Sequence, residues 1–167
     1  MRMVGPMEQR GFAIAGIRDG DEWRCEALPP AVLTDLGVLI SALRSQVPDG
    51  GPFVIASVDE EFFLIARLSG PRIVLLLSDL TAAVEYPLAA QALERLGEEP
   101  PEDDELDEVW PVGDLDIFAD LGLAEDEMER IIDDIDAYPD EMLEAIVAQI
   151  DLADAYERAA ESVRPTR

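Results

Sequence analysis

Short apolar runs separated by turn residues dominate the N-terminal part of the chain. They predict strands over residues 11–18, 22–28, 53–58, 62–68 and 72–78. Only a few residues join the last three strands to one another, and such short turns make neighbouring strands antiparallel. These three strands are apolar at almost every position instead of alternating. Both faces of the sheet are therefore covered within the chain, or one face is covered by a partner.

Two helices are predicted between and after these strands. Apolar residues at helical spacing, starting at Leu36, indicate the first helix. The second covers residues 81–96, with Asp79 as its N-terminal cap and an interruption or offset at Tyr86-Pro87. The element order is thus ββαβββα, for which one five-stranded antiparallel sheet with two helices packed on it is the economical arrangement. The predicted fold class is α+β.

The remainder of the chain predicts only helices. Asp114 is expected to cap a short helix that Gly122 closes. Three further amphipathic helices have their apolar stripes within residues 128–135, 142–150 and 152–159. Each has a single apolar face, so these helices must pack on each other, on the sheet or on another protein. Together they predict a small acidic all-helical C-terminal unit.

Acidic residues are concentrated in this helical part. The chain has 38 acidic and 12 basic residues, a net charge of −26. Residues 1–97 hold 13 acids against 8 arginines, a net of −5, and residues 98–167 hold 25 against 4, a net of −21. The change falls at a run of carboxylates with a Pro-Pro pair, which disfavours regular structure. We therefore expect a sheet domain at 10–97, an acidic linker at 98–112 and a helical unit at 113–162.

The composition excludes most common catalytic machineries. The chain has no His and no Lys, which removes imidazole bases, His metal ligands, Schiff-base lysines and the P-loop lysine. Cys25 is the only cysteine, so neither an intramolecular disulfide nor a cysteine zinc site can form. The sequence also contains no Gly-rich phosphate-binding loop of the GxGxxG kind. We expect no catalytic residues, no cofactor and no enzymatic activity of its own.

The sequence also bears on the compartment. Its N-terminal residues contain no apolar run resembling a signal peptide, and the apolar stretch at 73–77 is too short to span a bilayer. Cys25 lies beside Trp23 in a predicted strand, where a small buried thiol suited to a reducing compartment is expected. We expect a cytoplasmic protein whose acidic surface attracts cationic partners and repels nucleic acid and anionic membranes.

A carboxylate cluster is one candidate binding feature. Asp133, Asp134 and Asp136, together with Asp140 and Glu141, could hold a divalent cation. Their spacing lacks the EF-hand pattern and its central Gly, and they extend across predicted helix ends. Runs of charge of this kind are usually solvated faces, and that is the interpretation we favour.

An aromatic residue after the linker is the other candidate. Trp110 lies in a stretch without a predicted core of its own, so it either tethers the linker to the sheet or docks into a partner. Tyr138 with Pro139, in contrast, is explained as a helix start. The candidate partner-binding residues are Trp110, Asp133, Asp134 and Asp136.

Five motifs along the chain resemble one known family. They are Ser57-Val58-Asp59-Glu60-Glu61-Phe62-Phe63, Leu77-Ser78-Asp79-Leu80-Thr81-Ala82-Ala83, Tyr86-Pro87-Leu88-Ala89, Gly113-Asp114-Leu115 with Ala119-Asp120-Leu121-Gly122-Leu123, and Tyr138-Pro139-Asp140-Glu141-Met142-Leu143. Over roughly residues 10–160 the chain resembles the tRNA adenosine deaminase-associated proteins of high-GC Gram-positive bacteria. The resemblance implies a companion of the deaminase and supplies no catalytic or binding residues to transfer. The chain also lacks the deaminase's own zinc signature.

Several functions are compatible with these observations. The leading hypothesis is a non-catalytic accessory or regulatory protein that binds a tRNA adenosine deaminase or another basic nucleic-acid-acting enzyme. The second is a nucleic-acid mimic whose carboxylates copy a phosphate backbone and occupy a basic groove. The third, which the residues favour least, is a carboxylate-based cation binder. A homodimer formed through an edge strand is compatible with all of them.

Overall fold

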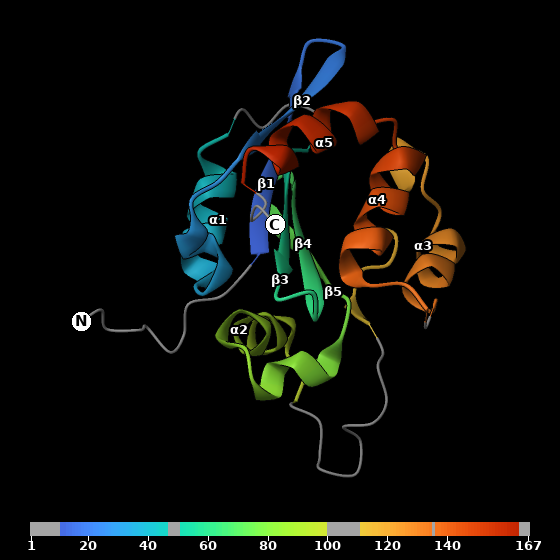
Figure 1. The fold of residues 1–167 in the computed structure, drawn as a ribbon. Helices are drawn as coiled ribbons and strands as arrows, with labels where there is room; N and C mark the ends of the chain where they lie inside the picture. Colours follow the sequence, from blue (N-terminus) through green and yellow to red (C-terminus); the bar gives the residue numbers. More distant parts are fainter. Residues whose placement is uncertain (1–10, 47–50, 100–110, 135, 164–167) are drawn as a thin grey trace, which may run out of the picture.

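Six antiparallel strands form one sheet in the described residues, in the order β2-β1-β3-β4-β5-β6. Figure 1 labels all of these strands except β6. The structure is a computed structural model that describes residues 11–46, 51–99, 111–134 and 136–163. The strands are β1 (Gly11–Asp19), β2 (Glu22–Ala27), β3 (Phe53–Val58), β4 (Phe62–Ser69), β5 (Arg72–Leu77) and β6 (Val112–Gly113). All five predicted strands are present, and each pairs antiparallel with its neighbours.

Strand β6 corrects the predicted count of five. It contains only Val112 and Gly113, which pair with Leu77 and Leu76 of β5, and two residues are too few to produce a hydrophobic pattern. Gly113 has a φ of 111°, and a Cβ atom at this position would lie 2.2 Å from the Leu75 carbonyl oxygen. Glycine therefore allows the chain to approach β5 this closely.

The helices of the described residues lie on both faces of the sheet. The α-helices are α1 (Leu36–Arg44), α2 (Pro87–Leu96), α3 (Glu125–Ile132), α4 (Pro139–Gln149) and α5 (Ala153–Glu161). The short 3-10 helices are η1 (Pro30–Leu33), η2 (Leu80–Val84) and η4 (Ala119–Leu121). Within this part of the chain, no helix combines the length and the apolar character that crossing a bilayer requires.

The segment after β5 contains the predicted cap and the predicted interruption. Asp79 Oδ1 accepts a hydrogen bond from the Thr81 N–H at 2.9 Å and thereby caps η2. α2 begins at Pro87, whose ring suits the first position of a helix and cannot continue the preceding one. The helix predicted over 81–96 is therefore a 3-10 helix followed by an α-helix.

The segment from Asp114 to Gly122 differs from the short capped helix that the sequence predicts. Its backbone hydrogen bonds span three residues: the Ile117 N–H donates to Asp114 O at 3.2 Å, and the Ala119 N–H donates to Asp116 O at 2.9 Å. Such bonds produce turns and the short helix η4 instead of an α-helix. Gly122 ends the segment as predicted, with a φ of 108°.

Different parts of the chain cover the two faces of the sheet (Figure 1). Val54, Ala56 and Val58 of β3 share a core with α1 and α2. Phe53 and Ile55, which alternate with them, share a second core with α3, α4 and α5. The central strands are apolar at nearly every position because both of their faces are buried by this chain. The C-terminal helices therefore pack on the sheet.

Candidate functional site

The predicted acidic residues Asp133, Asp134 and Asp136 lie in the connection between α3 and α4, and all three are exposed. The Asp133 N–H donates to Glu129 O at 2.9 Å at the end of α3. Asp134 Oδ1 accepts a hydrogen bond from the Asp136 N–H at 3.0 Å, a common way for an Asp side chain to stabilise a turn. Trp110, the fourth predicted binding residue, lies outside the described residues.

Tyr138 is an exposed aromatic residue that the sequence explains as a helix start and that is not among the predicted binding residues. Its backbone starts a helix as predicted: its N–H donates to Glu141 Oε1 at 2.9 Å, and buried Pro139 is the first residue of α4. The Tyr138 side chain is nevertheless 64% exposed. The available signal was its position before the first helical residue, outside the apolar stripe of α4. We define the acidic turn as Asp133, Asp134, Asp136 and Tyr138.

Besides Asp134, two of the five carboxylates considered for a cation site accept hydrogen bonds from other residues. Asp140 Oδ1 accepts a hydrogen bond from the buried Ser57 Oγ at 2.8 Å, which connects α4 to β3. Glu141 accepts from the Tyr138 N–H. In the described part of the chain, no group of three or more Asp, Glu or Cys side chains has an arrangement that could hold a metal ion. The geometry favours a solvated acidic surface here.

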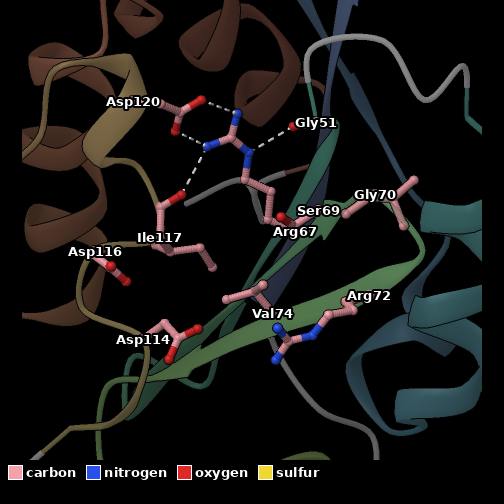
Figure 2. A pocket seen from close by; sticks show the side chains of 11 residues that line it. Gly51, Arg67, Ser69, Gly70, Arg72, Val74, Asp114, Asp116, Ile117 and Asp120 are labelled. Carbon is pink, nitrogen blue, oxygen red and sulfur yellow. Dashed lines mark hydrogen bonds and ion pairs between the residues drawn. The ribbon is translucent and has the colours of Figure 1, made fainter.

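A pocket of about 480 Å³ lies at the edge of the sheet, where β4 and β5 meet the segment that follows β6 (Figure 2). Its volume is within the range of small-ligand pockets, roughly 300–1,000 Å³. The charged residues that line it are Arg67, Arg72, Asp114, Asp116 and Asp120. The sequence does not predict this pocket, because its walls come from distant parts of the chain.

Arg67 forms one wall of the pocket although it is only 6% exposed. Its Nη1 and Nη2 atoms donate to the two carboxylate oxygens of Asp120 at 2.6 and 3.1 Å. Nη1 also donates to Ile117 O, and Nε donates to Gly51 O, each at 2.8 Å. The guanidinium carbon lies 5.6 Å from the centre of the Phe118 ring. These charge-assisted bonds fasten the segment after β6 to the sheet.

Asp114, Asp116 and Arg72 are the other charged residues of the pocket, and all three are exposed. In the part of the chain that the structure describes, none of their side chains forms a hydrogen bond or an ion pair. Figure 2 shows the two carboxylates on the segment after β6 and Arg72 on the other side of Val74. The pocket thus contains one closed ion pair and three unpaired charges, with one negative charge in excess.

Cys25 lies on β2 and is partly buried, whereas the sequence predicts a buried thiol. Burial raises the pKa of the Cys25 thiol to about 11, and the positive charge of Arg158 opposes this rise to a smaller extent. The thiol is therefore protonated at neutral pH. Because the thiolate is the reactive form of cysteine, this residue is not an activated nucleophile.

The profile of a family described as Rv3753c-like tRNA adenosine deaminase-associated protein matches residues 11–153. The chain belongs to this family. The resemblance seen in the five sequence motifs is thereby confirmed. One relative of this family member is "Protein Rv3753c" of Mycobacterium tuberculosis (strain ATCC 25618 / H37Rv), which is 39% identical over 145 residues, covering 86% of this chain and 84% of the relative. No solved structure matches the chain.

Proposed function

We propose that this family member is an accessory protein, without catalytic activity of its own, that binds a tRNA adenosine deaminase. The observation that supports this proposal is the match of residues 11–153 to a family described as deaminase-associated. An enzyme that acts on tRNA needs basic surface to contact the phosphate backbone. A chain with a net charge of −26 is complementary to such a surface, and complementary charge speeds encounter and suppresses wrong partners.

The acidic turn is the contact that we propose for this partner. The described residues 111–134 and 136–163 contain 17 acidic residues and two arginines, so the surface around the turn is strongly negative. Tyr138 adds an exposed aromatic ring to this surface, and aromatic residues are enriched among those that dominate binding energy. The carboxylates would attract a basic partner, and the ring would supply apolar contact area.

Purified full-length protein and the deaminase encoded in the same genome provide the test, with affinity measured by calorimetry. The triple variant Asp133→Asn, Asp134→Asn and Asp136→Asn should bind about tenfold more weakly at low salt, because exposed interface charges act mainly on association. A variant with Glu22→Gln, Glu94→Gln and Glu98→Gln removes the same charge from exposed positions in other parts of the molecule, and it should bind almost as tightly as the wild type. Equal losses in the two variants would contradict the assignment of the acidic turn, and no binding by the wild type would contradict the proposed function.

The density of exposed carboxylates also supports a second candidate, a nucleic-acid mimic. Such a mimic would compete with tRNA for the basic groove of the partner, and its affinity would fall steeply with salt. The accessory function predicts instead a contact that is less sensitive to salt and depends on an aromatic ring. The variant Tyr138→Ala distinguishes the two candidate functions. It should strongly weaken binding to the deaminase if the protein is an accessory protein, and should change binding little if the protein is a nucleic-acid mimic.

A further inference from the structure

The pocket beside β5 has the chemistry of a receptor for a planar cation. The Arg67–Asp120 pair is closed, because both Asp120 oxygens accept hydrogen bonds from the same guanidinium. Asp114 and Asp116 also line the pocket, and their carboxylates have no hydrogen-bond or ion-pair partner among the described residues. Two acceptor groups are thus presented to whatever enters the pocket (Figure 2).

The pocket also has a small apolar part beside these carboxylates. Ile117 is 5% exposed and Val74 is partly buried, and both line the pocket. An arginine side chain matches this combination, because its aliphatic stem packs along apolar surface while its planar guanidinium donates several hydrogen bonds to carboxylates. A lysine ammonium group is a point charge and lacks the planar pair of N–H donors with which a guanidinium binds both oxygens of a carboxylate.

We propose that this pocket binds an arginine side chain of the protein partner. The proposal rests on the proposed function only for the identity of the protein that contains the arginine, since the preference of the pocket can be measured without a partner. Arg72 also lines the pocket and bears a like charge with no partner among the described residues. The positive charge of Arg72 therefore repels a cationic ligand, and removing this charge should tighten binding of the ligand.

The first experiment is an NMR titration of the ¹⁵N-labelled full-length protein with N-acetyl-arginine amide at constant ionic strength. We expect saturable shifts of the Asp114, Asp116 and Arg72 amides, with a Kd on the order of 1–10 mM for this single residue. The lysine analogue should bind at least about fivefold more weakly. The citrulline analogue, which keeps the shape of arginine but is neutral, should produce no saturable shifts.

Substitutions then test which charged residues of the pocket determine its affinity for arginine amide. Asp114→Asn with Asp116→Asn should weaken arginine-amide binding at least about tenfold, and Arg72→Gln should tighten it a few-fold, about two- to fivefold, because a like charge is removed. Glu22→Gln with Glu94→Gln removes the same total charge from exposed positions on β2 and α2 and should leave the affinity unchanged. Binding of the citrulline or lysine analogue as tightly as arginine, or loss of arginine binding in Arg72→Gln, would overturn the proposal.

The same variants, assayed against the deaminase, separate the two proposals. If arginine amide binds in the pocket and the deaminase does not bind at all, the pocket assignment is supported and the proposed function fails. If the deaminase binds, but Asp114→Asn with Asp116→Asn leaves its affinity unchanged and arginine amide does not bind, the pocket assignment fails and the proposed function stands. Parallel losses of both affinities in this variant are the result expected if the partner inserts an arginine here.

Discussion

At the scale of single residues, Arg67 positions the charged pocket. A buried charge is costly unless it is paired and hydrogen-bonded, and the Arg67 guanidinium meets this requirement through Asp120 and two backbone carbonyl groups. The Asp120 side chain is 66% exposed, so only one partner of the pair is withdrawn from water. Because these bonds hold Ile117 and Asp120 against the sheet, they also fix the segment to which Asp114 and Asp116 belong.

Tyr86 has an unusual environment on the other face of the sheet. Its ring centre lies 5.2 Å from that of Phe62, and its hydroxyl donates a hydrogen bond to the Asp59 carboxylate in the β3–β4 turn. The pKa of Tyr86 is raised to about 12, chiefly by burial. The charge of Asp59, this hydrogen bond, and the charges of Glu61 and Glu85 contribute to the rise in decreasing order. The phenol is therefore held in its neutral form.

This raised pKa predicts that Tyr86 ionises at a higher pH than an ordinary tyrosine. Because the folded-state pKa lies above the ordinary value of 10.0, the native state keeps this proton longer than the unfolded chain does. The resulting stabilisation is present below pH 10 and is lost as the pH rises toward about 12. The ultraviolet titration difference between the wild type and Tyr86→Phe should have its midpoint near 12, and Asp59→Asn should lower that midpoint. Glu94→Gln is the control, circular dichroism verifies folding, and a wild-type midpoint near 10 would contradict the prediction.

At the scale of elements, the length of a strand or helix decides whether the sequence predicts it. The strands of six to nine residues were predicted because each contains enough apolar positions to show its pattern. The two residues of β6 were missed, because their conformation depends on contacts with β5. The short helix predicted from Asp114 to Gly122 is reduced to turns and the three residues of η4, because its backbone hydrogen bonds span three residues. Arg67 was the only local signal of the pocket, as the one charged residue in the apolar run 62–68.

The close approach of β6 to β5 makes Gly113 more sensitive to substitution than an ordinary turn glycine. Gly70 also has a positive φ, 61°, but an added Cβ would meet nothing within 4 Å there. Gly70→Ala should therefore lower the free energy of unfolding only by about 1–2 kcal/mol, the conformational cost of positive φ. Gly113→Ala should cost at least about 3 kcal/mol, because its Cβ would also collide with Leu75 O and separate β6 from β5. Urea unfolding measures both values, and equal values would contradict this account.

At the scale of the whole molecule, the sequence left open where the C-terminal helices pack. An amphipathic stripe shows that a helix has an apolar face but does not identify the surface that covers it. In the structure, Met128 of α3, Leu143 of α4 and Tyr156 of α5 share one core with Phe63 and Ile65 of β4. Helices α3, α4 and α5 are thus attached to the sheet by apolar contacts, while most of their charged residues are exposed. The boundaries expected at 98–112 stay a prediction.

A cut between the two halves tests how they are attached. A protease site inserted within residues 98–112 should yield, after cleavage, two fragments that co-elute at both low and high salt, because burial of apolar surface does not weaken as charges are screened. A fragment of residues 1–97 alone should aggregate or bind a hydrophobic dye, since Phe63 and Ile65 would then face water. Co-expression with residues 98–167 should restore a folded complex, which serves as the matched control. If the cleaved halves instead separate as folded monomers, the sheet domain and the helical unit fold independently and the shared core contributes little to stability.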